Sequence, residues 1–257
     1  MRDIVYILKN DIQPDELRYS LRSVCENFPH RNIVFVGGCP EGISCDVYIP
    51  HQQIGVTKWE RSTSSLKKAC ETESLTDEIF LFNDDFYVLQ KQDTDNFINY
   101  TNGTIGRRIK ELEKNVGRHS TYSRRLKNME ITLKGQGYDS ISFAVHMPML
   151  INRHNALEII SKNPSCPMFR SLYGNICRIP YTFHEDVKIY TNHEVPMYDD
   201  YLSTTEKSFA EGLVGEYIRK RFPHPCKYEY IKPIYTHELY TEDGDERYIA
   251  EPLEERR

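Results

Sequence analysis

The sequence predicts an α/β fold: one mainly parallel β-sheet flanked by helices, in a single domain over residues 1–257. Three observations predict it. Short apolar runs of strand type alternate with amphipathic helical stretches over residues 1–90, and such alternation favours parallel strands covered by helices. The composition, 39% hydrophobic and 28% charged, is that of a folded globular domain. A chain of 257 residues is long enough to bury a core.

The first strand is predicted at residues 4–8, which are apolar and are followed by the polar loop Lys9-Asn10-Asp11. A helix then begins at Pro14, because proline suits a first turn and the acidic residues that follow it suit the helix dipole. Apolar residues recur along this helix at helical spacing: Leu17, Leu21, Val24, Cys25 and Phe28.

Three further strands are predicted, at residues 33–36, 46–50 and 79–82. A helix over residues 62–73 precedes the last of them, and its first four residues (Ser, Thr, Ser, Ser) are N-cap candidates. The carboxyl ends of parallel strands meet at one edge of a sheet, where ligands bind. We therefore expect the loops after Leu8, Val36 and Phe82 to converge on one cleft, with Lys9 and Asn10 in the first loop.

Residues 106–134 are strongly basic and read as helical. The basic residues are Arg107, Arg108, Lys110, Lys114, Arg118, Arg124, Arg125, Lys127 and Lys134. One interpretation is a helical excursion into solvent, and the other is a mobile lid or a platform for acceptor phosphates. Residues 140–235 are expected to form a second half, with a helix starting near Arg153 and a strand at 186–190. The charged stretch 238–257 is expected to be peripheral.

Charge and cysteine usage exclude several classes of protein. The net charge of −5 leaves no chain-wide basic field, which argues against a generic nucleic-acid coat protein. The seven cysteines form no CxxC pair, so we expect mostly buried free thiols in a reducing compartment and no structural zinc. The N-terminal apolar run is too short for a signal peptide, and no run approaches the roughly 20 residues of a membrane span. A cytoplasmic location is expected.

The strongest candidate site is Asn83-Asp84-Asp85, directly after the apolar strand at 79–82. Two adjacent carboxylates at the end of a buried strand are costly to desolvate unless a cation neutralises them. Divalent cations such as Mg²⁺ prefer oxygen ligands, and a diphosphate would complete the ligand shell. A solvated acidic turn is the alternative. The motif predicts a metal site at Asp84 and Asp85, with Asn83 beside the bound anion.

Two histidine segments are candidates for proton transfer. His146 lies in an apolar stretch before Met147-Pro148, and a neutral imidazole there could accept a proton from an acceptor hydroxyl. His184-Glu185-Asp186 precedes the strand at 186–190 and could supply a base, His184, or a third metal ligand, Asp186. Asp85 is a further candidate for a catalytic role. A buried structural histidine and a polar strand cap are the respective alternatives.

Two basic segments are candidates for binding a phosphorylated ligand. Arg18 and Arg22 share a helix face at i, i+4 spacing and suit bidentate phosphate recognition, although an ordinary amphipathic helix has the same pattern. Lys58 and Trp59 precede the helix expected from Ser62, whose free N–H groups could bind an anion. The Trp59 ring could stack on a base or a sugar, and a capped surface loop is the alternative.

Three segments resemble conserved regions of the Stealth family. Residues 15–23 (DELRYSLRS), followed by the strand at 32–37 and by residues 80–86 (FLFNDDF), resemble its second region. Residues 3–7 resemble a shortened first region, and residues 142–148 (SFAVHMP) resemble the third, which carries a His-x-Pro element. Stealth proteins are hexose-1-phosphate transferases of bacterial capsules and are related to the lysosomal-enzyme GlcNAc-1-phosphotransferase.

The resemblance implies a Rossmann-like core akin to the GT-A glycosyltransferases, a nucleotide-sugar donor, Mg²⁺ or Mn²⁺, and a hydroxyl acceptor. Carried over by residue, Asp84 and Asp85 would bind the metal, Arg18 and Arg22 would support the donor loop, and His146 would lie at the reacting centre. The family's first region continues as Trp-Val-Asp/Asn-Gly, where this chain has residues 8–11 (LKND). Transfer of a sugar and transfer of a sugar-1-phosphate therefore both stay open.

The leading hypothesis is a metal-dependent transferase that moves a sugar or sugar-1-phosphate from a nucleotide-sugar to a glycan or polymer hydroxyl, as in surface polysaccharide modification. Residues 1–90 would bind the donor, and residues 140–235 would hold the acceptor and catalytic groups. The alternatives are a module that binds nucleic acid or an anionic surface through residues 106–134, a glycosyltransferase acting on DNA, and a protein of this fold that has lost its activity.

Overall fold

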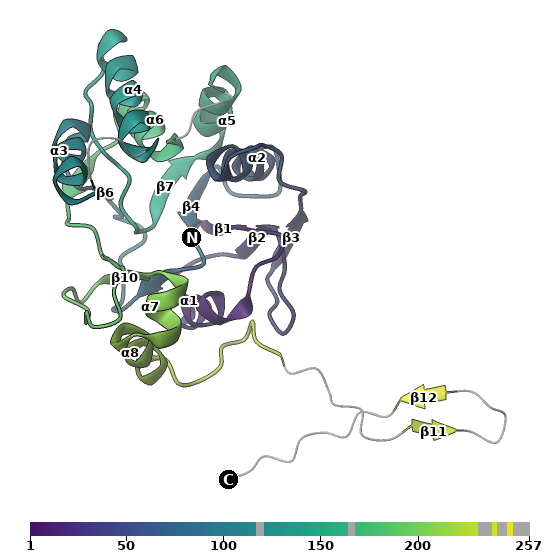
Figure 1. Ribbon diagram of the computed structural model, residues 1–257. Coiled ribbons are helices and arrows are strands. Elements are labelled where there is room, and N and C mark those ends of the chain that lie inside the picture. The colour runs from purple at the N-terminus through teal and green to yellow at the C-terminus, as the bar shows by residue number, and fades with distance from the viewer. Residues whose placement is uncertain (117–120, 164–167, 231–237, 241–245, 249–257) are drawn as a thin grey trace.

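The fold is that of a computed structural model, which describes residues 1–116, 121–163, 168–230, 238–240 and 246–248 (Figure 1). Its centre is a five-stranded sheet in the order β3-β2-β1-β4-β7. These strands are β1 (Asp3–Leu8), β2 (Ile33–Gly37), β3 (Val47–Pro50), β4 (Glu78–Phe82) and β7 (Met149–Asn152). The first four run parallel to one another, and β7 is antiparallel to β4. The sheet is therefore mainly parallel, as the sequence predicts.

Helices cover both faces of this sheet because alternate side chains of each strand point to opposite sides. In β1, Val5 belongs to the apolar core beneath α2 (Lys58–Cys70) and α5 (Arg153–Lys162). Its neighbours Ile4 and Tyr6 belong to the core beneath α1 (Pro14–Asn27). Figure 1 shows α1 on one side of the sheet and α2 on the other.

A second, smaller sheet continues directly from the end of β4. It has the order β5-β10-β9 and consists of β5 (Phe86–Val88), β10 (Tyr201–Thr204) and β9 (Lys188–Ile189). Helices α7 (Glu206–Glu211) and α8 (Leu213–Arg221) pack on it. The acidic turn between β4 and β5 is thereby brought beside β9, which lies about one hundred residues further along the chain.

Two minor strand pairs complete the β structure of the described residues. β6 (Asn99–Thr101) runs parallel to β8 (Tyr181–Phe183), and β11 (Glu238–Tyr240) is antiparallel to β12 (Glu246–Tyr248). The predicted strand at 186–190 is present but is only two residues long, as β9. The rest of the charged stretch 238–257 lies outside the described residues.

The basic segment forms α3 (Ile105–Val116) and α4 (Thr121–Gly135), and α6 (Phe169–Ile176) lies beside α4. Ile105 and Ile109 of α3, and Leu126 and Leu133 of α4, are buried in the main core. The helices predicted here are confirmed, but they are amphipathic and packed on the domain. The helical excursion is therefore not polar on all faces, because each helix carries an apolar stripe that packs on the main core.

Helix α2 begins four residues earlier than predicted. Its N-cap is Thr57, whose side chain accepts from the backbone N–H of Glu60, while the Glu60 side chain accepts from the backbone N–H of Thr57. This reciprocal capping box fixes the helix start. The run that starts at Ser62 therefore lies inside the helix, and Lys58 and Trp59 lie in its first turn.

The expectation of mostly buried cysteines is also wrong. Among the described cysteines only Cys70 is buried, while Cys25 and Cys39 are exposed. Cys166 lies outside the described residues. None of the described cysteines forms a disulfide. Within the described parts of the chain, no helix combines the length and the hydropathy needed to cross a membrane.

Candidate functional site

A cavity of about 860 Å³ opens at the carboxyl ends of β1 and β4. This is the edge of the sheet at which the sequence predicts a cleft, and the loops after Leu8 and Phe82 line it, but the predicted loop after Val36, which the structure also describes, contributes no lining residue. The cavity is further lined by the first turns of α2 and the start of α6. Helices α3 and α4, called the insertion helices below, also contribute to it. Its polar lining residues include Lys9, Asp11, Gln53, Lys58, Trp59, Arg61, Ser62, Asn83, Asp84, Arg108, Tyr122, His146, Arg170 and Tyr190.

The acidic pair forms one wall of this cavity and the layer behind it. Asp84 lines the cavity, and its pKa is raised to about 6, first by burial and then by the neighbouring charge of Asp85. Asp85 is not a lining residue. Its Oδ2 accepts hydrogen bonds from Lys188 Nζ at 2.5 Å and from Ser203 Oγ at 3.1 Å. Its Oδ1 is buried and has no hydrogen-bond partner among the described residues.

These carboxylates fit a divalent cation that is shared with a bound anion. The oxygen of Asp85 without a partner, and the desolvated carboxylate of Asp84 at the cavity wall, are ligands of the type that Mg²⁺ and Mn²⁺ take. No group of three or more His, Cys, Asp or Glu residues of the described chain is placed to hold a metal. A cation at this pair would therefore take its other ligands from water and from an anionic ligand.

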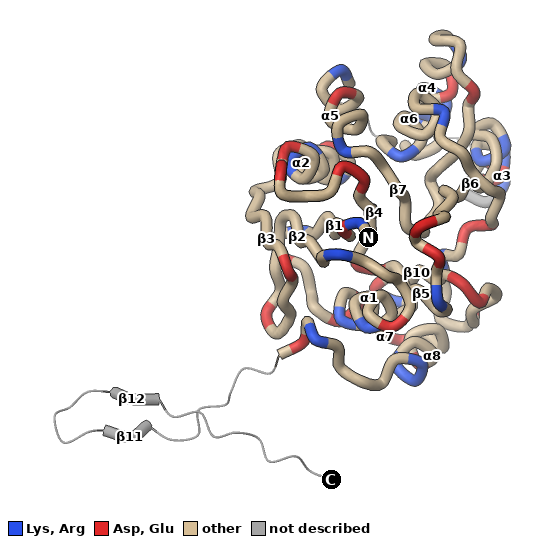
Figure 2. Tube along the Cα trace, turned by 180° about the vertical axis from the view of Figure 1, so that it is seen from behind, with Lys and Arg blue, Asp and Glu red and all other residues tan. Residues whose placement is uncertain are grey.

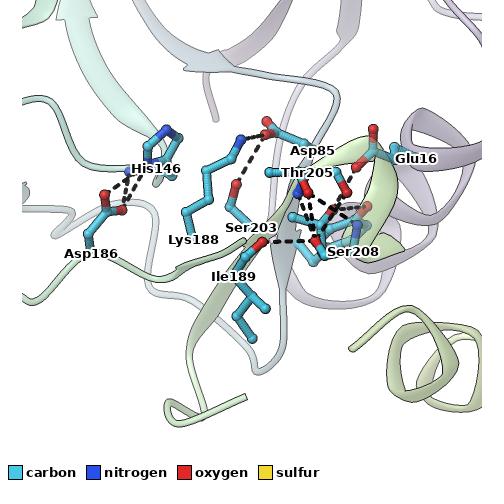
Figure 3. A network of polar contacts seen from close by, with 11 residues as sticks. Glu16, Asp85, His146, Asp186, Lys188, Ile189, Ser203, Thr205 and Ser208 are labelled. Carbon is cyan, nitrogen blue, oxygen red and sulfur yellow. Dashed lines mark hydrogen bonds and ion pairs between the residues drawn. The ribbon is translucent and has the colours of Figure 1, made fainter. Parts of the chain in front are cut away.

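His146 and Asp186 form a directed pair at the same cavity (Figure 3). His146 Nδ1 lies 2.8 Å from Asp186 Oδ1 and 3.0 Å from Oδ2, and the His146 backbone N–H also donates to Oδ1 at 3.2 Å. Burial alone would raise the pKa of Asp186, but the bonds to His146 and the charge of Arg108 outweigh it, so the pKa is lowered. An ionised carboxylate accepts only, so a neutral ring carries its proton on Nδ1. Nε2 is then the acceptor.

The segment Asp186-Val187-Lys188 positions both polar pairs. Val187 is buried in the core beside α1, whereas Asp186 and Lys188, two residues apart, point to the opposite side. Figure 3 shows Asp186 reaching His146 and Lys188 reaching Asp85 side by side. One short extended stretch therefore orients the histidine and anchors the acidic turn.

Glu16, in the first turn of α1, belongs to the same neighbourhood (Figure 3). Its Oε1 accepts a hydrogen bond from Thr204 Oγ1 at 2.6 Å. Burial raises its pKa to about 7, and the charges of Asp85 and Asp84 add to that rise. Glu16 thus lies near the Asp84-Asp85 pair, and of these three carboxylates it is Asp85 that bonds to Lys188.

The cavity also holds cations without a carboxylate partner. Lys9, Lys58, Arg61 and Arg170 each line it, and none has a carboxylate within 4.0 Å among the described residues. Arg170 Nη1 donates to the carbonyl oxygens of Met147 at 2.6 Å and of Val145 at 3.3 Å. Burial lowers the pKa of Arg170 to about 10, so its guanidinium stays charged near neutral pH. Four cations on one cavity suit an anion that carries two or more charges.

Trp59 stands at the boundary between α2 and α4. The Arg125 guanidinium lies 3.9 Å from the ring centroid, and the Lys58 ammonium lies 4.9 Å from it. Since Trp59 lines the cavity, a ligand that stacks on the ring would have to share it with Arg125 or displace it. The contact links the insertion helices to the helix that carries the predicted anion-binding residues.

The cavity brings together seven of the predicted site residues: Lys9, Lys58, Trp59, Ser62, Asn83, Asp84 and His146. Asp186 lies directly behind it through its contact with His146, and Asp85 follows the lining residue Asp84 and pairs with Lys188. Asn10 is not among its lining residues. His184 is not either: its Nε2 lies 3.2 Å from Asp200 Oδ2, and its ring packs against Tyr100 and Tyr198.

The predicted arginines of α1 also lie elsewhere. Arg22 donates to Glu229 from Nε at 2.7 Å and from Nη2 at 2.8 Å, and Arg18 Nη1 donates to the same carboxylate at 2.8 Å. The Glu229 side chain is 5% exposed, so it is enclosed by these contacts. Arg22 lines a separate cavity of about 760 Å³ beside Cys226. The α1 arginines bind the C-terminal part of the described chain instead of the cavity.

Lys188, Arg170 and Ser203 are candidate site residues that the sequence reasoning missed, whereas Arg108 belongs to the basic segment for which a lid or a phosphate platform is one interpretation. One signal was available for Lys188. In a stretch of alternating polar and apolar residues, Asp186 and Lys188 fall on one face, and a lone lysine on the buried side of a strand requires a partner. Nothing in the local sequence around Arg170 or Ser203 distinguishes them from ordinary surface residues.

No family model matches the chain, and no curated protein matches it either. Among solved structures, it is similar to the galactosyltransferase LgtC in complex with donor and acceptor sugar analogs, with a TM-score of 0.50 and 10% identity over 88% of this chain and 96% of LgtC. An active-site mutant of LgtC gives a TM-score of 0.48 and 11% identity over 85% of this chain and 94% of that one.

The glycosyltransferase GlyE of Streptococcus pneumoniae TIGR4 gives a TM-score of 0.37 at 14% identity, over 72% of this chain, which spans 45% of the GlyE chain. At these identities the likeness to LgtC concerns the fold. The chain has a mixed α/β fold of the GT-A type, as the sequence predicts.

Proposed function

We propose that this protein is a glycosyltransferase that moves a sugar from a nucleotide-sugar donor to a hydroxyl acceptor. The observation that carries the proposal is the composition of one cavity: an acidic wall, four cations without carboxylate partners among the described residues, and a histidine oriented by a carboxylate. The GT-A-type fold supports it, because LgtC, which shares that fold, was solved in complex with donor and acceptor sugar analogs.

The donor's diphosphate would lie against Lys9, Lys58, Arg61 and Arg170, which match its charge. Asp84 and Asp85 would hold Mg²⁺ or Mn²⁺, and the cation would supply stabilisation of charge on the departing phosphate. A nucleotide-sugar and a divalent metal thus remain the proposed donor and cofactor.

His146 would act as the general base. Its Nε2 would accept the proton of the acceptor hydroxyl as that oxygen attacks the anomeric carbon of the sugar. Asp186 would stabilise the imidazolium that forms, because its ionised carboxylate already accepts a hydrogen bond from Nδ1. The bond broken lies between the sugar and the diphosphate, and the nucleoside diphosphate would leave with its charge held by the cations.

Transfer of a sugar-1-phosphate is a second candidate, favoured by the Stealth-like segments around Asp84 and His146. In that reaction the acceptor oxygen would attack the phosphorus next to the sugar, and a nucleoside monophosphate would leave. A glycan or capsule-type polymer as the acceptor, and a cytoplasmic location, belong to the same proposal.

A nucleic-acid role for the basic insertion has less support. Arg107 bonds with Glu111 and Glu185, Lys127 with Glu113, and Lys134 with Glu130. Figure 2 shows acidic residues interspersed with basic ones along α3 and α4. Charges that are already paired contribute little to the binding of a polyanion.

A donor-hydrolysis screen tests the proposal. UDP-, GDP-, CDP- and CMP-sugars are each incubated with Mn²⁺ or Mg²⁺, and the released nucleotide is identified. We expect one class of UDP-, GDP- or CDP-sugar to be hydrolysed to the nucleoside diphosphate, and a nucleoside monophosphate from such a donor would assign the sugar-1-phosphate reaction instead. A CMP-sugar releases CMP by ordinary sugar transfer, so its product does not separate the two reactions. Asp84→Asn should lose the activity, while the exposed Asp95→Asn should keep it. Hydrolysis of no donor, or full activity of Asp84→Asn, would refute the proposal.

A further inference from the structure

The ion pair between Lys188 and Asp85 has a consequence for metal binding at the acidic wall. The side chains of Lys188 and Asp85 are only 14% and 13% exposed. The lysine ammonium and the Ser203 hydroxyl both bond to Asp85 Oδ2. A divalent cation that bound Asp85 through both oxygens would have to displace the ammonium, because the two cations would occupy the same side of the carboxylate.

The other oxygen of Asp85 points away from these partners. Oδ1 is buried without a hydrogen bond among the described residues, so the carboxylate is satisfied on one side only. Asp84 faces the cavity, and no third metal-binding side chain of the described chain joins the pair. The protein therefore offers a metal one free carboxylate and one that is half occupied by an internal cation.

We propose that Lys188 is an internal cation that competes with a divalent metal ion for Asp85 and so sets the metal affinity of the site. In the protein without a donor, Lys188 neutralises Asp85 and metal binds weakly. This inference deepens the proposed function, because it concerns the cation at the same acidic pair. Lys188 is a positioning residue here, since it would affect the metal ion only through its contact with Asp85.

A purely structural role for Lys188 is the competing explanation, and stability alone would not separate the two. Removal of one partner from a buried ion pair destabilises the fold in either case, since the remaining charge is left uncompensated. Metal affinity does separate them. A structural role predicts that metal binding is unchanged or weaker in a Lys188 variant, whereas competition predicts that it becomes tighter.

The test is a titration of the full chain with Mn²⁺ alone, with the free ion followed by electron paramagnetic resonance. Lys188→Met keeps the aliphatic stem, and Lys188→Gln keeps a hydrogen-bond donor to Asp85. We expect at least one of them to fold and to bind Mn²⁺ about tenfold or more tightly than the wild type. Mn²⁺ should also raise the melting temperature of that variant more than it raises the melting temperature of the wild type.

Two controls locate the effect. Lys207→Met changes a lysine on α7 that is 71% exposed, and its Mn²⁺ affinity should equal that of the wild type. Adding Asp85→Asn to the Lys188 variant should abolish the gain. An unchanged or weaker Mn²⁺ affinity in whichever Lys188 variant folds, or a gain that survives Asp85→Asn, would each overturn the inference. The titration contains no donor, so its outcome is independent of the outcome of the donor-hydrolysis screen.

Discussion

At the scale of single residues, the proposed chemistry depends on the contact between His146 and Asp186. The carboxylate accepts from the ring Nδ1 and from the backbone N–H of the same histidine, so it fixes both the ring and the loop that carries it. The rings of Phe86 and His146 lie nearly perpendicular to each other, with 6.5 Å between their centroids. Because Nδ1 faces Asp186, Nε2 is the atom proposed to accept the proton.

The base assignment predicts a graded loss of activity. His146→Ala should lower kcat by about 10²–10⁴-fold, the usual contribution of a general base. Asp186→Asn should lower kcat less, because the histidine remains but loses its orientation. Steady-state kinetics on the donor found by hydrolysis measures both. The exposed His193→Ala is the matched control, and a kcat of His146→Ala within about twofold of the wild type would contradict the assignment.

Sequence reasoning found single residues where a local signal existed. Asn83 and Asp84 follow an apolar strand that ends at the sheet edge, so strand direction alone placed them at the cavity. His146 was a candidate because of its apolar surroundings and its place in a segment that resembles the Stealth family. The partner of a charged residue could not be predicted where the partner is distant in the sequence. Asp85 meets Lys188 across 103 residues and Arg22 meets Glu229 across 207, and nothing near either residue indicates its partner.

At the scale of elements, α2 presents Lys58, Trp59 and Arg61 to the cavity from its first turns. The capping box of Thr57 and Glu60 fixes where the helix begins and therefore where these side chains point. The signal was visible as a Thr followed three residues later by Glu, but the run of serines and threonine from Ser62 offered competing caps. The strands were predictable because each is a short apolar run, whereas the two-residue β9 depends on its pairing with β10.

Thr57→Ala tests the link between this helix start and the site. Loss of the cap should cost about 1 kcal/mol of unfolding free energy, measured by urea denaturation. It should also weaken donor binding, because the first turn of α2 frays. The control for binding is Thr72→Ala. Thr72 lies just beyond the other end of the helix, and this change removes a hydroxyl that donates to the Lys68 carbonyl. Unchanged donor affinity in Thr57→Ala would show that the helix cap does not influence donor binding.

At the scale of the whole molecule, the two ends of the described domain are joined through Glu229. Its carboxylate accepts from Arg18, from Arg22 and from the backbone N–H of Cys226. Burial would raise the pKa of Glu229, but these bonds outweigh it and lower the pKa to about 2. The α1 arginines, which resemble donor-loop residues in the sequence, therefore stabilise the fold in the structure.

Glu229→Gln should lower the unfolding free energy by about 3 kcal/mol at pH 7, as expected for a broken buried ion pair. The folded pKa is depressed, so the stabilisation is present above the ordinary value of 4.5 and is lost as pH falls towards 2. The difference between wild type and variant in urea denaturation should therefore shrink from about pH 6 to about pH 3. Donor hydrolysis by the folded variant should be unchanged. A selective loss of activity would contradict this expectation and indicate that Arg18 and Arg22 contribute to the donor site.

The central claim is that the cavity beside Asp84 binds a nucleoside diphosphate, and the fluorescence of Trp59 tests it most directly. Trp59 is the only tryptophan in the chain and lines that cavity, so its emission reports on this site alone. UDP, GDP and CDP are titrated in the presence of Mn²⁺. We predict a saturable change with one of them that is weakened about tenfold or more in Arg170→Gln. No saturable change with any of the three, or the same affinity in Arg170→Gln, would contradict the account.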